Sequence, residues 1–236
     1  PPLPCASCSP VQINQLYIVG GDGTMRAANI VYKAVSARVC APMMRGSVAA
    51  PRAPLCCPLT AAPVAFSQRL PISVAGVPKT VDNDLPITDN CPGFGSVAKY
   101  IAVSTLEASY DVRSMAATST KIFVIEVMGR HAGWIAAAGA LVEDYGIPVV
   151  TLFPEVEFDQ EKFLAAVDAK VKEYGYCTIV VSEGAHYPDG TFLAEQGTRD
   201  SFGHAQLGGA APIVANMIKD ALGHKFHWAV ADYLQR

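Results

Sequence analysis

Two carboxylates, Asp82 and Asp84, flank an asparagine in the segment GVPKTVDNDLP, just after a lysine and a threonine. A carboxylate can accept the proton of an attacking hydroxyl group, and the ammonium group of Lys79 can neutralise phosphate oxygens. Phosphoryl transfer needs these two functions and in-line positioning, but little covalent chemistry from the protein. The two acids point the same way if the backbone between them is extended. The segment therefore predicts a phosphoryl-transfer site, and a turn of solvated acids is the alternative.

A second polar segment, GGDGT at residues 20–24, lies between a predicted strand and a predicted helix. Its glycines let the backbone approach a ligand, and the helix N-terminus offers free N–H groups to an anion. Because Asp22 is too acidic to face a phosphate directly, a bridging Mg²⁺ is its natural partner. A tight turn, with Thr24 as a simple helix cap, explains this segment equally well.

Two further candidates follow apolar segments near the middle and end of the chain. Arg130 lies in MGRHAG, where its guanidinium group suits bidentate contact with a phosphate. Glu183 ends TIVVSEG and can accept hydrogen bonds from sugar hydroxyl groups, with a turn acid as the alternative.

The elements that must position these residues alternate along the chain. Strands are expected at 15–19, 71–77, 121–127, 147–155 and 176–184, and helices at 25–35, 94–115, 134–146, 159–175 and 211–223. Near-continuous apolar strands that alternate with helices predict an α/β fold, a mostly parallel sheet with helices on both faces. Ligands gather at the carboxyl ends of such strands, so the four polar segments should converge on one edge of the sheet.

The overall composition excludes several classes of protein. A net charge of −3 lacks the basic footprint of a nucleic-acid binder. We see no apolar run of about 18 residues and no secretory signal, so the sequence predicts no membrane partner and a cytoplasmic location, with a plastid as the alternative. Seven cysteines without framework spacing predict reduced thiols. Residues 36–70 are rich in Ala, Pro, Arg and Cys, and we interpret them as a low-complexity insertion.

Six segments together resemble the phosphofructokinase family: GGDGT, GVPKTVDNDLP, GFGSVAKY, EVMGRHAGW, VVSEG and DYLQR. PKTxDND combined with MGR is far more specific than any glycine motif alone. The resemblance implies a phosphofructokinase-like, Rossmann-like three-layer fold, with a donor-binding portion at 11–135 and a fructose 6-phosphate-binding portion at 136–236. It also implies transfer of a phosphoryl group to the 1-hydroxyl of fructose 6-phosphate, giving fructose 1,6-bisphosphate in glycolysis, with Mg²⁺ and as a homo-oligomer.

The resemblance also assigns roles by position. Asp82 is the base that takes the proton from the sugar's 1-hydroxyl, supported by Lys79, Thr80 and Asp84. On the donor side, Asp22 holds Mg²⁺, and the donor-binding residues are Gly21, Gly23 and Thr24. Fructose 6-phosphate is bound by Met128, Gly129, Arg130, Glu183, Tyr233 and Arg236. Lys121 matches a position often filled by an arginine that reaches across a subunit interface.

The donor and the competence of this chain stay open. Family members that use pyrophosphate usually carry a second acid at the position of Gly23, so the glycine favours ATP. Lys79, GFGSVAKY and HWAVADYLQR resemble pyrophosphate-dependent forms, which are the alternative. A further glycine loop expected before residue 15 and helices expected after LQR are absent, which implies an N- and C-terminally incomplete chain. An inactive fragment or regulatory subunit is therefore a second alternative. A diacylglycerol- or NAD-kinase-like enzyme shares only GGDGT.

Overall fold

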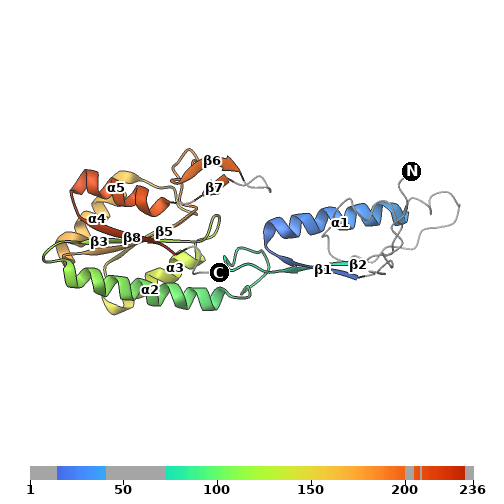
Figure 1. Ribbon diagram of the computed structural model, residues 1–236, viewed down its shortest axis with the longest axis horizontal. Helices are drawn as coiled ribbons and strands as arrows, with labels where there is room; N and C mark the ends of the chain where they lie inside the picture. The colour runs from blue at the N-terminus through green and yellow to red at the C-terminus, as the bar shows by residue number, and fades with distance from the viewer. Residues whose placement is uncertain (1–14, 41–72, 200–204, 208, 232–236) are drawn as a thin grey trace, which may run out of the picture. The chain divides into compact units, whose positions relative to one another are not determined.

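The computed structural model describes residues 15–40, 73–199, 205–207 and 209–231 (Figure 1). The chain forms two compact units, residues 1–79 and 80–236. Residues 80–135 therefore belong to the same unit as 136–236, whereas the division expected from the sequence falls at 135. That division concerns donor and sugar binding, and it stays a prediction.

The first unit contains a parallel pair of strands and one helix. Strand β1 (Gln15–Gly20) pairs with β2 (Ser73–Pro78), and α1 (Asp22–Cys40) follows β1 and contacts both strands. Both strands appear where the sequence predicted them. The helix is longer than the expected 25–35, because no proline occurs between Asp22 and Ala41 and Ala and Arg favour helix. Residues 36–40 of the interpreted insertion are therefore helical, and 41–70 lie outside the described residues, so the insertion stays a prediction.

The second unit is built on a parallel sheet of four strands. Its order is β4 (Val149–Leu152), β5 (Cys177–Ser182), β3 (Ile122–Val127) and β8 (Phe226–Val230). Every residue of β5 is buried, and five of the six in β3 are, which explains their continuous apolar sequences. Strand β8 was not predicted, because it is a half-exposed edge strand that shows neither a continuous apolar run nor a clean alternation.

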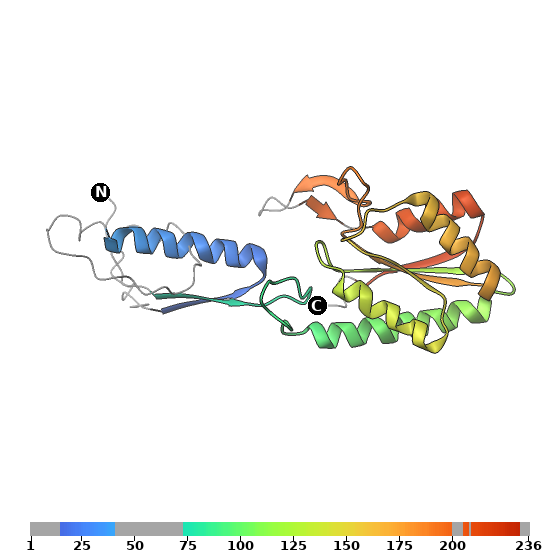
Figure 2. The same ribbon diagram turned by 180° about the vertical axis from the view of Figure 1, so that it is seen from behind.

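Helices cover both faces of this sheet, as expected (Figures 1 and 2). One face carries α2 (Phe94–Met115) and α3 (Trp134–Ala140), and the other carries α4 (Gln160–Tyr174) and α5 (Ala210–Leu222). A separate apolar core fills the space on each side of the sheet. The helix expected at 134–146 is divided, since its last part, Leu141–Tyr145, is a 3₁₀ helix that ends at a left-handed Gly146.

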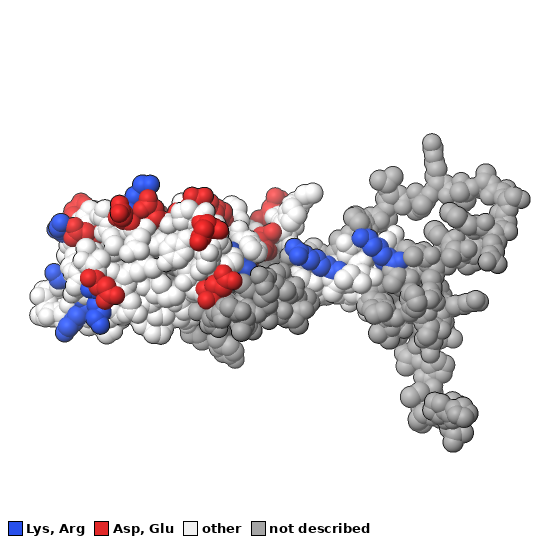
Figure 3. All heavy atoms as spheres, turned by 90° about the horizontal axis from the view of Figure 1, so that it is seen from above, with Lys and Arg blue, Asp and Glu red and all other residues white. Residues whose placement is uncertain are grey.

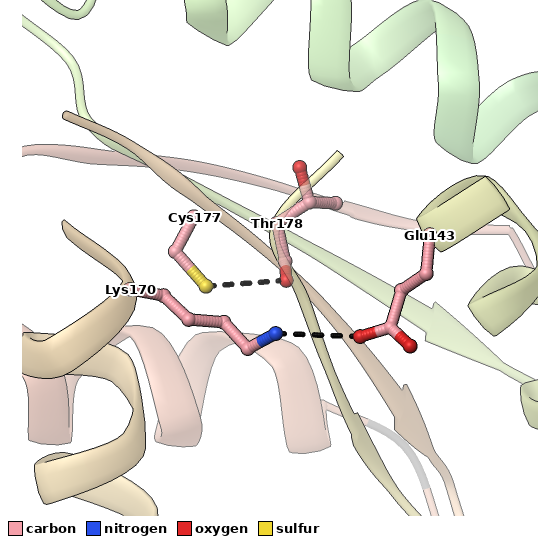
Figure 4. A network of polar contacts seen from close by, with 4 residues as sticks. All are labelled: Glu143, Lys170, Cys177 and Thr178. Carbon is pink, nitrogen blue, oxygen red and sulfur yellow. Dashed lines mark hydrogen bonds and ion pairs between the residues drawn. The ribbon is translucent and has the colours of Figure 1, made fainter. Parts of the chain in front are cut away.

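Polar contacts hold α4 at its N-terminus and at Lys170. The Asp159 carboxylate accepts a hydrogen bond from the Lys162 amide at 3.1 Å and caps the helix. Figure 4 shows Lys170 of α4, whose Nζ lies 3.3 Å from Oε1 of Glu143.

The same view shows the thiol of Cys177 in β5, which donates to the carbonyl of Thr178 at 3.5 Å. Burial raises the pKa of this thiol to about 12, so it stays protonated.

An antiparallel pair that the sequence analysis did not predict lies between β5 and α5 along the chain. It consists of β6 (Glu195–Arg199) and β7 (Ala205–Leu207). Within the described ranges, no helix combines the length and apolar character that a membrane crossing needs.

Candidate active site

The turns that follow β3 and β5 lie side by side and bring two predicted segments together. Val127 and Ser182 are partners in the sheet, and the Glu183 amide extends the pairing by donating to the Val127 carbonyl at 2.9 Å. Oε1 of Glu183 then accepts from the Gly129 amide at 3.4 Å. MGR and SEG therefore meet at the carboxyl ends of neighbouring strands, as the sequence predicted.

Close backbone packing holds these two turns. Gly129 has a φ of +130°, and a Cβ atom there would lie 2.5 Å from the carbonyl oxygen of Ala132. A Cβ atom on Gly184 would lie only 2.0 Å from the carbonyl oxygen of Arg130. The buried hydroxyl of Ser182 donates to the Gly129 carbonyl. Sequence analysis missed Ser182 and Gly184, although a glycine just after a buried strand is a signal of close backbone approach.

At this site the side chain of Arg130 is available to a ligand, whereas the side chain of Met128 packs in the core. Nε of Arg130 is buried and has no hydrogen-bond partner among the described residues, which suits it to receive a ligand oxygen. The Met128 side chain is 9% exposed and packs in the core between the sheet, α2 and α3. The Met128 side chain therefore offers little surface to a ligand.

The TVDND segment forms a turn rather than an extended stretch. Asn83 adopts a left-handed conformation, with φ of 56°, and its Oδ1 accepts from the Cys91 amide at 2.8 Å. Asparagine tolerates this conformation better than most residues. The Thr80 hydroxyl accepts from the Asp82 amide at 3.2 Å. Because the backbone between Asp82 and Asp84 is not extended, the condition for the two carboxylates to point the same way is not met.

The residues present are compatible with a magnesium ion, although they form no ready-made cage. Oδ1 of Asp84 is buried and accepts no hydrogen bond from the described residues. Among those residues, no group of three or more His, Cys, Asp or Glu could hold a metal ion. Mg²⁺ at phosphoryl-transfer sites is usually held by one or two carboxylates together with substrate phosphates. The buried Oδ1 of Asp84, which has no hydrogen-bond partner among the described residues, fits that pattern.

The first unit brings GGDGT close to the start of PKT. The Lys79 amide donates to the Gly20 carbonyl at 2.7 Å, and the Lys79 side chain is exposed. Helix α1 begins at Asp22, so Thr24 lies inside its first turn and is not its cap. The Thr24 side chain occupies the space beside Gly20, where a Cβ atom would lie 2.4 Å from its hydroxyl oxygen. Convergence of this unit's segments with MGR and SEG on one edge stays a prediction.

Lys121 lies at the opposite end of β3 from Arg130. It precedes the strand's first residue, which places it about 20 Å from the carboxyl end at ~3.3 Å per residue. Its amide donates to the carbonyl of Lys225 at 3.1 Å. Lys225 lines a cavity of about 600 Å³ together with Thr120, Lys219, His224 and His227, among others. Burial, and then the charge of Lys121, lower the pKa of His224, and Asp168 acts in the opposite direction. Within one chain, therefore, Lys121 is remote from the MGR turn.

Two predicted sugar-binding residues lie near the end of the chain. Tyr233 and Arg236 lie outside the described residues, and the last described position is Ala231. Figure 3 looks onto the face of the second unit that α4 and α5 cover, and acidic side chains are spread across it. No broad basic face is visible in this view among the residues that are coloured.

Sequence analysis also missed a buried acid, Glu126, within the apolar strand β3. Its side chain is 3% exposed, and its two carboxylate oxygens accept backbone hydrogen bonds from Gly209 and Ala211. The signal was available, because a single acid in the run IFVIEV must be satisfied by hydrogen bonds if it is buried.

Comparison with known proteins agrees with this arrangement. The family model described as phosphofructokinase matches residues 5–230. The chain belongs to the phosphofructokinase family. It is 68% identical over 168 residues to the pyrophosphate–fructose 6-phosphate 1-phosphotransferase of Methylococcus capsulatus, and this match covers 70% of the chain. The same match covers 40% of that relative, so the chain spans well under half of its length.

Solved structures of phosphofructokinases show the same fold. The pyrophosphate-dependent phosphofructokinase from Nitrosospira multiformis is 62% identical with a TM-score of 0.61, over 73% of this chain and 40% of that one. The pyrophosphate-dependent enzyme from Marinobacter aquaeolei is 48% identical with a TM-score of 0.65, over 95% and 45% of the two chains. The predicted α/β fold, with mostly parallel strands and helices on both faces, is confirmed. Its described parallel strands form two sheets rather than one.

Proposed function

We propose that this chain belongs to an enzyme that transfers a phosphoryl group from pyrophosphate to the 1-hydroxyl of fructose 6-phosphate, giving fructose 1,6-bisphosphate. The observation that carries the proposal is the pair of interlocked turns after β3 and β5, which joins Gly129 and Arg130 to Glu183 in a family member. Relatives with 62% and 68% identity are named for pyrophosphate. They support pyrophosphate over ATP, the donor that Gly23 favoured.

On the sugar side, residues of the second unit bind fructose 6-phosphate and activate its 1-hydroxyl. Arg130 offers a buried, unbonded Nε to an oxygen of fructose 6-phosphate, and Glu183 accepts from a sugar hydroxyl group. Asp82 takes the proton of the 1-hydroxyl as this oxygen attacks the phosphorus atom. Thr80 fixes the Asp82 amide, and Asp84 supports the same turn. Met128 contributes backbone, and Tyr233 and Arg236 bind the 6-phosphate.

On the donor side, the proposal uses the first turn of α1. The backbone of Gly21 and Gly23, together with Thr24, borders the donor phosphates, and the free N–H groups of the helix start face them. Asp22 would hold Mg²⁺, and the bound ion would supply positive charge to the phosphate oxygens. Lys79 adds a positive charge beside them. The enzyme is a cytoplasmic homo-oligomer in which Lys121, remote from its own MGR turn, contacts the sugar phosphate of a neighbouring subunit.

A direct test uses the purified full chain with fructose 6-phosphate, Mg²⁺ and either pyrophosphate or ATP. Formation of fructose 1,6-bisphosphate is followed by coupling to aldolase and an NADH-linked reaction, and binding of fructose 6-phosphate is measured by calorimetry. We expect turnover with pyrophosphate and little with ATP. Turnover with ATP alone would overturn the donor assignment. Binding without turnover would favour a fragment or regulatory subunit, and absence of binding would overturn the proposed function.

A further inference from the structure

Glu126 is the one charged residue in an otherwise apolar strand, and it is almost completely buried. A carboxylate is expensive to bury unless donors surround it. Here Oε1 accepts from the Gly209 amide at 3.2 Å, and Oε2 accepts from the Ala211 amide at 2.8 Å. Both amides belong to the start of α5, so the acid of one element caps a helix of another.

Helix α5 cannot supply this cap from its own sequence. Its N-cap residue is Gly209, with φ of 94°, and its first turn contains no acid. Pro212 has no N–H group, so the amides near the helix start need an acceptor from elsewhere. A carboxylate at this position also interacts favourably with the helix dipole. Glu126 therefore fixes where the N-terminus of α5 sits on the sheet.

The same residue lies where the elements of the sugar site meet. In the sheet Glu126 is opposite Val181 on one side and Val230 on the other. Its carbonyl oxygen accepts from the Ala231 amide at 3.1 Å, where the chain leaves β8. The MGR turn begins at Met128, two residues after Glu126. Glu183 lies two residues after Val181, the residue that pairs with Glu126 in the sheet.

We infer that Glu126 is a positioning residue for sugar-phosphate binding. Its carboxylate holds α5 against β3, and this contact sets the backbone that leads into Met128–Arg130 and the position of Ala231 just after β8. The inference rests on the proposed function, because it assigns Glu126 to the site that binds fructose 6-phosphate. It adds a residue that does not itself touch the ligand.

The test uses Glu126→Gln in the full chain, a change that keeps the shape of the side chain. Its carbonyl oxygen still accepts one hydrogen bond, but its NH₂ group meets the second backbone N–H, and the charge is lost. We expect binding of fructose 6-phosphate to weaken about tenfold, because hydrogen bonds to charged groups are among the stronger ones. Hydrogen exchange should accelerate at the amides of Gly209 and Ala211 and also at Gly129.

Two controls separate positioning from general loss of stability. Asp159→Asn makes the same chemical change at the start of α4, where the carboxylate caps its own helix. Ser109→Ala removes a buried hydroxyl that bonds Thr178 and Thr105 on the other face of the sheet. Both should keep the parent affinity for fructose 6-phosphate within about twofold, and Ser109→Ala should lower the melting temperature.

The outcomes distinguish a failure of the proposed function from a failure of the positioning role of Glu126. If the parent chain does not bind fructose 6-phosphate, the proposed function fails and this inference fails with it. If the parent binds and Glu126→Gln binds equally well while it is folded, the proposed function stands and the positioning role is wrong. If exchange accelerates at Gly209 and Ala211 but not at Gly129, and affinity is unchanged, Glu126 is only a helix cap. Weaker binding in Ser109→Ala as well would also contradict the positioning role.

Discussion

Replacing Gly184 with alanine should force apart the two turns that carry Arg130 and Glu183. The new Cβ atom would lie 2.0 Å from the Arg130 carbonyl oxygen and 2.6 Å from the carbonyl carbon. Ordinary contact begins at about 3.4 Å, so one turn must move by about 1.4 Å, and the atoms in the way are backbone. Gly184 does not have a left-handed φ, so lack of space, rather than backbone strain, causes the effect.

The expected magnitude follows from that displacement. Forcing an extra carbon into a packed site typically costs about 1–3 kcal/mol in the free energy of unfolding. A displacement of about 1 Å in a positioned group can cost on the order of 10²-fold in activity. We therefore expect Gly184→Ala to unfold at lower urea concentration, measured by circular dichroism. We also expect it to lose most of its affinity for fructose 6-phosphate, measured by calorimetry.

A matched variant makes the result interpretable. Gly95 lies in the first turn of α2, and apart from its chain neighbours and the local helix backbone no atom lies within 4 Å of the position where its Cβ would be. Gly95→Ala should therefore stabilise the chain by about 0.5–1 kcal/mol, because glycine inside a helix costs conformational entropy. If Gly184→Ala unfolds at the parent's urea concentration and binds fructose 6-phosphate equally well, the close approach of the two turns is wrong.

Two further predictions test the proposed base and the buried thiol. Asp82→Ala should lower the rate of fructose 1,6-bisphosphate formation by about 10²–10⁴-fold while circular dichroism stays unchanged, and near-parent turnover would exclude Asp82 as the base. Because burial raises the pKa of Cys177 to about 12, iodoacetamide at pH 8 should label Cys177 only after unfolding in urea. The thiol ionises more readily in the unfolded chain, so stability should fall as pH rises from about 9 toward 12, by at most about 1.4 kcal/mol per pH unit. Rapid labelling of folded Cys177, detected by mass spectrometry, would contradict its burial.

The sequence by itself determined most of the elements around the site and the positions of the polar segments. Strands such as IFVIEV and CTIVVS are nearly continuous apolar runs, and the helix at Phe94–Met115 matches its expected bounds. Because parallel strands end at the same edge, MGR and SEG could be expected to meet, and they do. Local pattern decides these features, since periodicity and strand ends depend on residues close together in the chain.

Only the tertiary structure decided which atoms meet within those segments. Gly129 and Glu183 are 54 positions apart, and Glu126 and Gly209 are 83 apart. No local pattern pairs them, because strand order and helix placement depend on how the whole core packs. The left-handed Asn83 between the two acids depends on its bond to the Cys91 amide, eight residues away. The sequence thus names the chemistry of each turn, and long-range packing sets the direction in which its groups point.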